Sequence, residues 1–266
     1  MSEKMRADVA LVRRGLCTSR EKAQAAIMAG QVFSGVRRID KASEFIRHED
    51  ALELRGPAIP FVGRGGLKLE KAMDVFHADV RGRVCMDLGC ATGGFTDVLL
   101  QHGASHVYSV DVGYGQFDWK LRQDSRVTLM ERTNARYLTS EMLPLHPTVT
   151  VMDVSFISIR LILPVAAGIM GREGVFYTLV KPQFEAGREH VGKNGVVRDS
   201  SVHEQVLRDL VRFASDMGWH VHALDYSPIT GPKGNIEFLA EIMPGPHGEV
   251  SEEYIHLLVR QAHVSL

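Results

Sequence analysis

The stretch that decides the fold runs from Val84 to Leu100 and reads VCMDLGCATGGFTDVLL. An apolar run typical of a buried strand ends at Asp87, a glycine-rich turn spans Gly89 to Gly94, and an apolar helical segment follows. Glycines in such a turn let the backbone approach a ligand closely. The turn lacks the Lys-Ser/Thr ending of a phosphate-binding loop and the full glycine spacing of dinucleotide sites. The sequence therefore predicts a strand–turn–helix unit at a ligand site.

Polar residues after the next two predicted strands point to an adenosyl cofactor. Asp111 ends the strand in VYSVDVGYGQ, and Asn134 follows the third strand in ERTNAR. An acid at the end of the second strand accepts hydrogen bonds from the two ribose hydroxyls of a bound adenosine. Asn134 is placed to reach the adenine edge. With the glycine turn, these residues predict an adenosyl-cofactor site.

Strands and helices alternate from Arg83 onward, which predicts a Rossmann-like α/β fold with a mostly parallel, seven-stranded sheet covered on both faces. The last two strands are joined by SPITGPKGN with no helix between them, so the final strand must be reversed. The predicted strands are 84–88, 106–110, 127–130, 149–152, 175–179, 220–225 and 236–242. Helices are expected at 96–102, 158–170, 203–217 and 251–263.

The N-terminal segment is basic, although the whole chain has a formal net charge of −1. Residues 1–38 contain eight Lys or Arg and three acids, a net charge of +5, so the remainder carries −6. A basic head on an acidic body indicates a polyanion-binding module. On charge alone, a solvated basic surface remains an equal alternative.

The same segment is predicted to form a compact α+β unit. A short helix over 6–14 ends at Gly15, a second begins after the capping residues Thr18 and Ser19, and short strands follow at 31–33, 44–46 and 51–54. The stretch MRADVALVRRGLCTSREKAQAAIMAGQVFSG resembles the RNA-binding domain first seen in ribosomal small-subunit protein four. In the alternative, Arg6 and Arg20 pair with Asp8 and Glu21. The resemblance implies RNA contacts from Arg6, Arg13, Arg20 and Lys22.

A boundary between two domains is expected in RGPAIPFVGRGG, which holds two prolines and four glycines. We predict an RNA-binding domain at 1–58, a linker at 59–66 and a second domain at 67–266. Just beyond the linker, Leu69, Ala72, Met73 and Phe76 follow helical spacing. Lys68 and Lys71 lie away from this apolar stripe.

Four charged residues far apart in the sequence form the candidate catalytic set. Asp153 and Lys181 end the fourth and fifth strands, at the edge where open α/β sheets bind ligands. Glu237 opens the reversed strand at the same edge, and Lys68 comes from the helix that enters the domain. This ordered set resembles the tetrad of ribose 2′-O-methyltransferases.

The whole chain resembles the TlyA family, and the part from Lys68 to Met243 resembles the wider FtsJ-like group. The pieces RGGLKL, DLGCATGGFTD, MDVSFIS, VKPQFE and GNIEFL occur in family order, although Gly63 stands where many relatives have Ser. The resemblance implies S-adenosylmethionine as cofactor, no metal, and catalysis by Lys68, Asp153, Lys181 and Glu237. It implies cofactor binding by Asp87, Gly89, Gly93, Gly94, Phe95, Asp111, Asn134 and Asp153.

The implied substrate is ribosomal RNA or a ribosomal subunit. A lysine near the ribose hydroxyl, for which Lys181 is the candidate, stabilises the developing alkoxide and takes its proton if burial depresses its pKa. The family implies methylation of a cytidine in 23S rRNA, and in longer members also in 16S rRNA. The extended N-terminus and C-terminal helix favour both targets. Cys85 and Cys90 are expected to be packing residues rather than nucleophiles of a base methyltransferase.

Other function classes remain as alternatives. They are a non-catalytic RNA-binding protein that senses the cofactor, a membrane-active haemolysin-type protein, and another RNA enzyme with the same head domain, such as a pseudouridine synthase. The sequence has no signal-peptide core and no apolar run near the roughly 20 residues of a membrane helix. With an odd, low cysteine count, these features predict a cytoplasmic protein without membrane partners.

Overall fold

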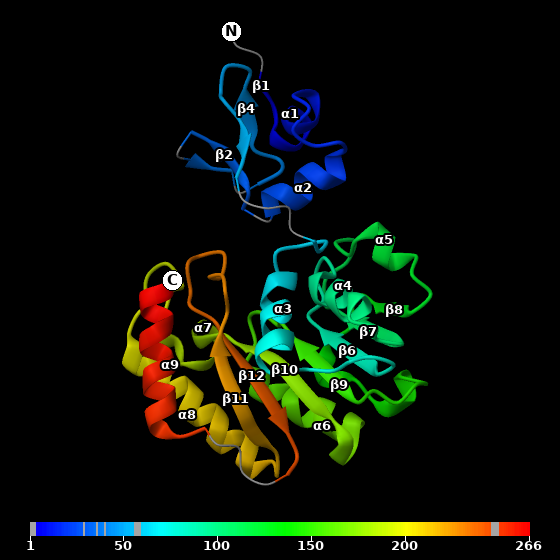
Figure 1. The fold of residues 1–266 in the computed structure, drawn as a ribbon, viewed down its shortest axis with the longest axis vertical. Coiled ribbons are helices and arrows are strands. Elements are labelled where there is room, and N and C mark those ends of the chain that lie inside the picture. Colours follow the sequence, from blue (N-terminus) through cyan, green and yellow to red (C-terminus); the bar gives the residue numbers. More distant parts are fainter. Residues whose placement is uncertain (1–3, 29, 36, 40, 56–59, 246–249) are drawn as a thin grey trace. The chain divides into compact units, whose positions relative to one another are not determined.

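The computed structural model describes residues 4–28, 30–35, 37–39, 41–55, 60–245 and 250–266. The chain divides into two compact units, Met1–Gly65 and Gly66–Leu266. Figure 1 colours them along the sequence, from blue at the N-terminus to red at the C-terminus. Residues 56–59, which span the end of the predicted first domain and the start of the predicted linker, lie outside the described residues.

The N-terminal unit is a small α+β domain, as predicted. Its core is formed by apolar residues of both helices and the strands that follow them: Ala7, Ala10, Leu11, Ala23, Ile27, Val32, Ile39 and Ile46. One small sheet pairs β1 with β4, and the other has the order β3-β2-β5. The elements are β1 (Lys4–Arg6), α1 (Ala7–Arg13), α2 (Arg20–Met28), β2 (Val32–Ser34), β3 (Arg37–Arg38), β4 (Phe45–Arg47) and β5 (Glu53–Leu54).

A fully buried carboxylate, Asp8, joins the two helices of this unit. Its oxygens accept hydrogen bonds from Arg6 Nε at 3.0 Å, Arg20 Nη2 at 2.9 Å and Gln24 Nε2 at 3.0 Å. The hydrogen bond from Arg6 holds the pKa of Asp8 far below its usual range. Arg6 therefore pairs with Asp8 as the alternative expected, but Arg20 also pairs with Asp8 and not with Glu21.

The C-terminal unit contains the predicted seven-stranded sheet, with the order β11-β12-β10-β9-β6-β7-β8. Strand β12 is antiparallel to both β10 and β11, and the other pairings are parallel. The reversed strand is thus inserted between β10 and β11, and it begins at Phe238 rather than Ile236. The strands are β6 (Val84–Leu88), β7 (His106–Val110), β8 (Val127–Met130), β9 (Val149–Met152), β10 (Val175–Val180), β11 (His220–Tyr226) and β12 (Phe238–Met243).

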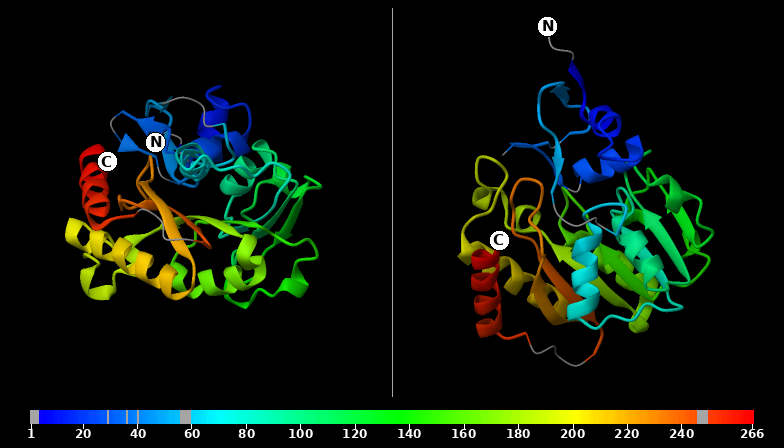
Figure 2. Two further views of the ribbon diagram at one scale, coloured as in Figure 1. Left: turned by 60° about the horizontal axis from the view of Figure 1, so that its bottom comes forward. Right: turned by 45° about the horizontal axis from the view of Figure 1, so that its top comes forward.

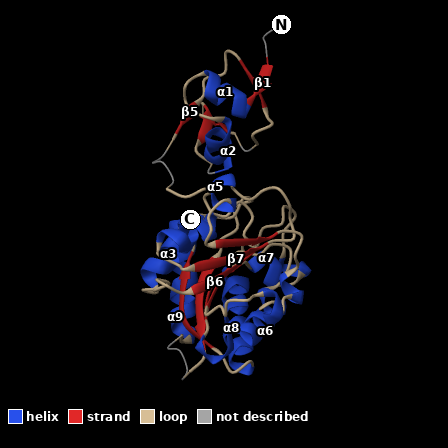
Figure 3. Cartoon of the chain, turned by 90° about the vertical axis from the view of Figure 1, so that its right-hand side faces the viewer, coloured by secondary structure: helices blue, strands red, loops and turns tan. Residues whose placement is uncertain are grey.

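Helices cover both faces of this sheet, α3 and α4 on one and α6 and α8 on the other (Figures 1 and 3). The predicted helix over 158–170 is instead a 3-10 turn (Ile159–Leu161) followed by α6, because Pro164 sits in the first turn of α6 and cannot continue a preceding helix. The helices are α3 (Gly66–Val75), α4 (Gly94–Gln101), α5 (Trp119–Arg122), α6 (Leu163–Met170), α7 (Pro182–Glu185), α8 (Ser200–Asp216) and α9 (Glu252–Ser265).

The C-terminal helix α9 packs on α8 and on β11, as the two further views in Figure 2 also show. Ser251 caps it by accepting a hydrogen bond from Tyr254 N at 3.1 Å. Within the described ranges, no helix is long and apolar enough to cross a membrane.

A pair of histidines also joins α8 to α9. His203 is fully buried, donates through Nε2 to the Val197 carbonyl at 3.2 Å, and has its Nδ1 3.0 Å from His263 Nε2. Because Nε2 carries the donated proton, neutral His203 accepts at Nδ1 from His263. Burial lowers the pKa of His203 to about 4.

We predict that this pair makes the protein less stable in acid. A neutral His203 is favoured in the folded state, so stability is lost as the pH falls from about 6.5, the unfolded value, toward about 4. In His203→Gln, the loss of unfolding free energy between pH 7 and pH 4.5 should be smaller than in the wild type. Urea denaturation at both pH values measures this, and equal losses in the two proteins would refute it.

Candidate active site

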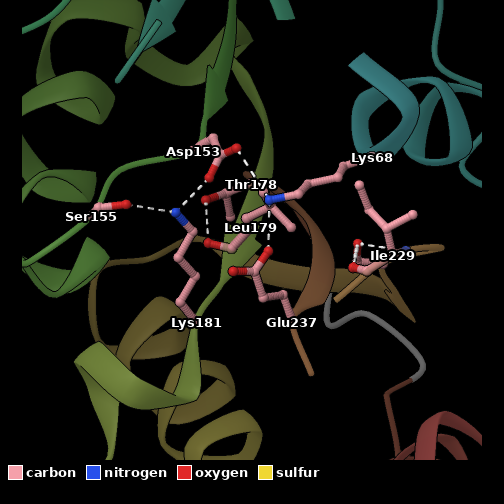
Figure 4. Close-up of polar contacts among 9 residues, drawn as sticks. Lys68, Asp153, Ser155, Thr178, Leu179, Lys181, Ile229 and Glu237 are labelled. Carbon is pink, nitrogen blue, oxygen red and sulfur yellow. Dashed lines mark hydrogen bonds and ion pairs between the residues drawn. The ribbon is translucent and has the colours of Figure 1, made fainter. Parts of the chain in front are cut away.

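Four charged side chains predicted from distant parts of the sequence meet at the carboxyl edge of the sheet (Figure 4). Lys68 Nζ lies 2.7 Å from Glu237 Oε2 and 3.4 Å from Asp153 Oδ2. Lys181 Nζ lies 2.6 Å from Asp153 Oδ1. The cluster therefore contains two ammonium groups and two carboxylates, with Asp153 bridging both lysines.

The neighbouring elements hold each of the four residues in place. Lys68 lies in the first turn of α3, and Lys181 and Asp153 directly follow β10 and β9. Glu237 immediately precedes β12, where its carbonyl accepts a hydrogen bond from Ser227 N at 2.8 Å. Lys68, Lys181 and Glu237 are all buried.

A second lysine fixes α3 against the same hairpin that carries Glu237. Lys71 Nζ donates to Asp225 Oδ1 at 2.9 Å and to the Tyr226 carbonyl at 2.7 Å, one turn of helix beyond Lys68. The same ammonium lies 3.8 Å from the centroid of the Tyr226 ring. Both lysines of α3 thus contact the β11–β12 hairpin, although the apolar spacing of the sequence had placed them only on a common face.

Asp153 has competing influences on its pKa. Burial raises the pKa, but the ammonium groups of Lys68 and Lys181 lower it by more, so the net shift is downward. Asp153 is therefore a carboxylate at neutral pH and can hold both lysines. Lys181 also donates to Ser155 Oγ at 2.9 Å, so its ammonium is held from two sides.

A cavity of about 460 Å³ adjoins this cluster, and Asp153 lies in its wall. Its size lies within the range of pockets for drug-sized ligands, about 300–1,000 Å³. Four of the predicted cofactor residues line it, namely Gly89, Asp111, Asn134 and Asp153. The remaining lining residues come from the loops after β6, β7, β8 and β9: Ala91, Val110, Val112, Gly113, Gln116, Thr133, Ala135, Val154, Ser155, Phe156, Ile157 and Ile162.

The backbone shapes the wall of this cavity. Asp111 accepts hydrogen bonds from Ala91 N at 2.8 Å and Gly113 N at 2.6 Å, which joins the loops after β6 and β7. Gly89 has a φ of +85°, and a Cβ there would lie 2.9 Å from the Asp153 carbonyl oxygen. Only glycine permits both this conformation and this approach.

The other predicted cofactor residues are buried and do not line the cavity. Asp87 is fully buried and accepts from Thr96 N at 2.9 Å and Thr96 Oγ1 at 2.6 Å, and burial raises its pKa to about 7. Gly93 has a φ of +94°, and a Cβ there would lie 2.6 Å from Leu121 Cδ1. Gly94 and Phe95 are buried at the start of α4. Asp87 and Phe95 thus flank the turn, and Gly93 and Gly94 form its last part.

The two cysteines near the turn are packing residues, as predicted. Cys85 and Cys90 are both buried. Burial raises the pKa of Cys85 to about 12 and raises that of Cys90 further. Neither thiol is therefore available as a thiolate nucleophile at neutral pH.

Two residues of the site were not predicted from the sequence. Ser155 contacts Lys181, and Phe156 is 92% exposed beside the cavity with a φ of +65°. A positive φ is uncommon for a bulky residue and often marks a functional segment. Their position directly after the strand-ending Asp153, in DVSF, was the available signal.

Comparisons with known proteins agree with this arrangement. Residues 61–241 match the model of the FtsJ-like methyltransferase family, and residues 5–52 match the S4 domain. A Bacillus subtilis protein provisionally named an rRNA methyltransferase, YqxC, is 50% identical over 100% of this chain and 96% of its own length. The Mycobacterium tuberculosis 16S/23S rRNA (cytidine-2′-O)-methyltransferase TlyA is 42% identical over 90% of this chain and 89% of its own.

A solved structure is also similar over the full chain. It is a protein from Streptococcus thermophilus provisionally named a hemolysin, with 47% identity, a TM-score of 0.79, and coverage of 100% of this chain and 98% of that one. The matched models cover the two units that the structure separates, and they occur in the order S4 domain, then methyltransferase domain. This chain therefore belongs to the TlyA family, the FtsJ-like methyltransferases that carry an N-terminal S4 domain.

Proposed function

We propose that this protein transfers a methyl group from S-adenosylmethionine to the 2′-hydroxyl of a cytidine in ribosomal RNA. The observation that carries the proposal is the buried cluster of Lys68, Asp153, Lys181 and Glu237 in the wall of a cofactor-sized cavity. A protein that merely sensed the cofactor would have no use for a complete set of this kind, because burying four charges is costly.

The cavity suits an adenosyl cofactor. Gly89 leaves room where a Cβ would press against the Asp153 backbone, so a ligand can lie close to the main chain. The Asp111 carboxylate stands at the cavity wall, where it can accept hydrogen bonds from ribose hydroxyls, and Asn134 lies on the same wall to meet the adenine edge. The part of the wall formed by Val110, Ala135 and Ile162 is apolar and suits the flat faces of the base.

The chain itself must hold the ribose and accept the proton that the 2′-hydroxyl loses. S-adenosylmethionine, when bound, supplies a methyl group that its sulfonium already activates. A ribose hydroxyl keeps its proton at neutral pH and is a weak nucleophile. Lys181 is held by Asp153 and Ser155. In its uncharged amine form it accepts that proton, and the resulting ammonium offsets the negative charge on the oxygen. Lys68 and Glu237 keep Asp153 in position.

The proposed substrate rests on the relatives and on the domain composition. The Mycobacterium tuberculosis relative is named for methylating cytidine in 16S and 23S rRNA, and the S4 match adds a domain suited to RNA. The exposed ring of Phe156 beside the cavity provides a face on which an unstacked base can lie. We propose both subunit RNAs as targets and the cytoplasm, where ribosomes are found, as the location.

We predict that Lys181→Ala abolishes methyl transfer and leaves cofactor binding intact. The variant removes the proton acceptor and the counter-charge of the developing alkoxide, and loss of one such electrostatic partner costs about 10²–10³ in rate. Single-turnover methylation of rRNA at saturating cofactor measures the chemical step, and calorimetry measures cofactor binding. A wild-type rate in this variant would move the catalytic role to Lys68.

We predict that Asp111→Ala weakens the binding of S-adenosylmethionine, because the variant loses the ribose acceptor and the link between the loops after β6 and β7. Asp118→Ala is the matched control, since Asp118 is a nearby acid that caps α5 and does not line the cavity. Calorimetry without added metal should give a raised Kd for Asp111→Ala only. Equal affinities in both variants would remove Asp111 from the cofactor site.

Two groups of arginine and lysine should behave differently in the N-terminal unit. Arg13 and Lys22 are exposed and make no ion pair with any described residue, whereas Arg6 and Arg20 are engaged by Asp8. We predict that the double variant Arg13→Gln with Lys22→Gln weakens rRNA binding and lowers the slope of its log affinity against log salt by about 1–2, while its stability stays unchanged. The variant Arg20→Gln should instead lower the melting temperature. An unchanged salt slope in the double variant would exclude this surface from RNA binding.

A further inference from the structure

Arginines and lysines of the C-terminal unit fall into paired and unpaired groups. Many are matched with a carboxylate, such as Arg122 with Glu131 and Arg208 with Glu204. Several exposed cations have no carboxylate of a described residue within ion-pair distance, and Lys193, Arg198 and Lys233 are three of them. Residues 39–266 carry a net charge of −6, so an exposed cation there that lacks a carboxylate partner is available to an external anion.

These three cations come from two segments that a buried amide joins. Lys193 and Arg198 lie between α7 and α8, and Lys233 lies in the β11–β12 hairpin loop. Asn235 is buried, donates through Nδ2 to the Gly195 carbonyl at 2.9 Å, and accepts at Oδ1 from Val197 N at 3.0 Å. A Cβ built on Gly195 would lie 3.3 Å from Lys233 Nζ, so the two segments are in contact.

The first of these segments forms a hollow of about 370 Å³, whose lining includes His190, Lys193, Arg198 and Asp199. Asp199 keeps its negative charge there, and it caps α8 by accepting from Ser201 N at 2.9 Å and Ser201 Oγ at 2.7 Å. The adjacent Glu189 lies beside His190, 4.0 Å from its Nε2. Two cations, Lys193 and Arg198, and one carboxylate, Asp199, line the hollow, so the formal charge of these three groups is +1.

The same segments lead directly to the active site. Lys233 is four residues before Glu237, and Asn235 is two residues before it. The loop that carries Lys193 and Arg198 follows Lys181 through α7. Figure 4 shows Ile229, from the same hairpin loop, in the close-up of the cluster. An anion held by these cations is thus bound by chain segments that also set the position of Glu237 and Lys181.

We propose that Lys193, Arg198 and Lys233 form a phosphate-binding patch that holds the RNA backbone flanking the target nucleotide. The inference rests on the proposed function and assigns the methyltransferase unit an RNA-binding surface of its own. Lysine and arginine suit phosphate oxygens, and Lys193 and Arg198 line a hollow of about 370 Å³ that can admit a phosphate group. Asn235 is the positioning residue that ties the patch to the start of β12.

The test compares two triple variants of the full-length protein with equal charge. The patch variant is Lys193→Gln, Arg198→Gln and Lys233→Gln. The control is Arg81→Gln, Arg172→Gln and Arg212→Gln, three exposed cations near the amino ends of β6, β10 and β11. rRNA affinity is measured between 50 and 200 mM salt, and the slope of log affinity against log salt falls by about 0.7–0.9 for each phosphate contact that is lost. Single-turnover methylation is measured separately at saturating RNA.

The proposal predicts a salt slope lowered by about 2–3 in the patch variant, a raised KM, and an unchanged single-turnover rate at saturating RNA. The control should keep the wild-type slope and KM. Equal slopes in the wild type and the patch variant, or equal losses in both variants, would overturn the patch. If the wild-type protein fails to methylate rRNA, the proposed function fails instead, and the two outcomes are thereby distinguished.

A second variant tests the link through the amide. Asn235→Asp keeps the size of the side chain but loses the donor to Gly195 and adds a negative charge beside the patch. We expect weaker rRNA binding with unchanged S-adenosylmethionine affinity. Wild-type rRNA binding in Asn235→Asp with a preserved melting temperature would show that the patch does not depend on this amide.

Discussion

The interaction on which the site depends is the buried contact of Lys68 with Glu237 and Asp153. An unpaired charge buried in protein costs several kcal/mol, so each ammonium at the carboxyl edge needs a carboxylate beside it. Two lysines and two acids meet this requirement, and Asp153 serves both lysines. Removal of any one member would leave an uncompensated charge among the other three.

This charge balance requires the reversed strand. Glu237 reaches the carboxyl edge because β12 runs antiparallel to β10, so that the beginning of β12 lies beside the end of β10. A parallel strand at the same place would begin at the opposite edge of the sheet and would carry its first residue away from Lys68. Strand β11, which forms the hairpin with β12, also provides Asp225 and Tyr226 for Lys71. These contacts fix the position of α3 relative to the hairpin.

Both units use some cations for structure and leave others exposed. In the N-terminal unit, Asp8 engages Arg6 and Arg20, while Arg13 stays exposed. In the C-terminal unit, Lys68 and Lys181 are bound to acids of the site, and Lys71 is bound to Asp225 of β11. Charge counts treat all of these residues alike, whereas the structure separates those that contact a carboxylate, such as Arg6 and Arg20, which share the single charge of Asp8, from those that make no ion pair with a described residue.

The sequence alone determined most of the strands and the order of the candidate catalytic residues. Strands β6 to β9 have the predicted bounds because their apolar runs are short and end at polar or glycine residues, which are local signals. The reversed strand also followed from a local feature, a loop too short for a crossover. The candidate tetrad was found because strand ends in an α/β sheet share one edge.

The tertiary structure decided which of these residues face the cavity and which only support it. Asp87, Gly93, Gly94 and Phe95 lie in the diagnostic motif, yet they are buried away from the cavity, because burial there depends on how α4 packs on the sheet. The insertion of β12 between β10 and β11, and the choice of Asp8 rather than Glu21 as the partner of Arg20, were likewise decided by packing. Local patterns determine secondary structure, whereas contacts between residues far apart in the chain depend on distances that only the folded molecule establishes.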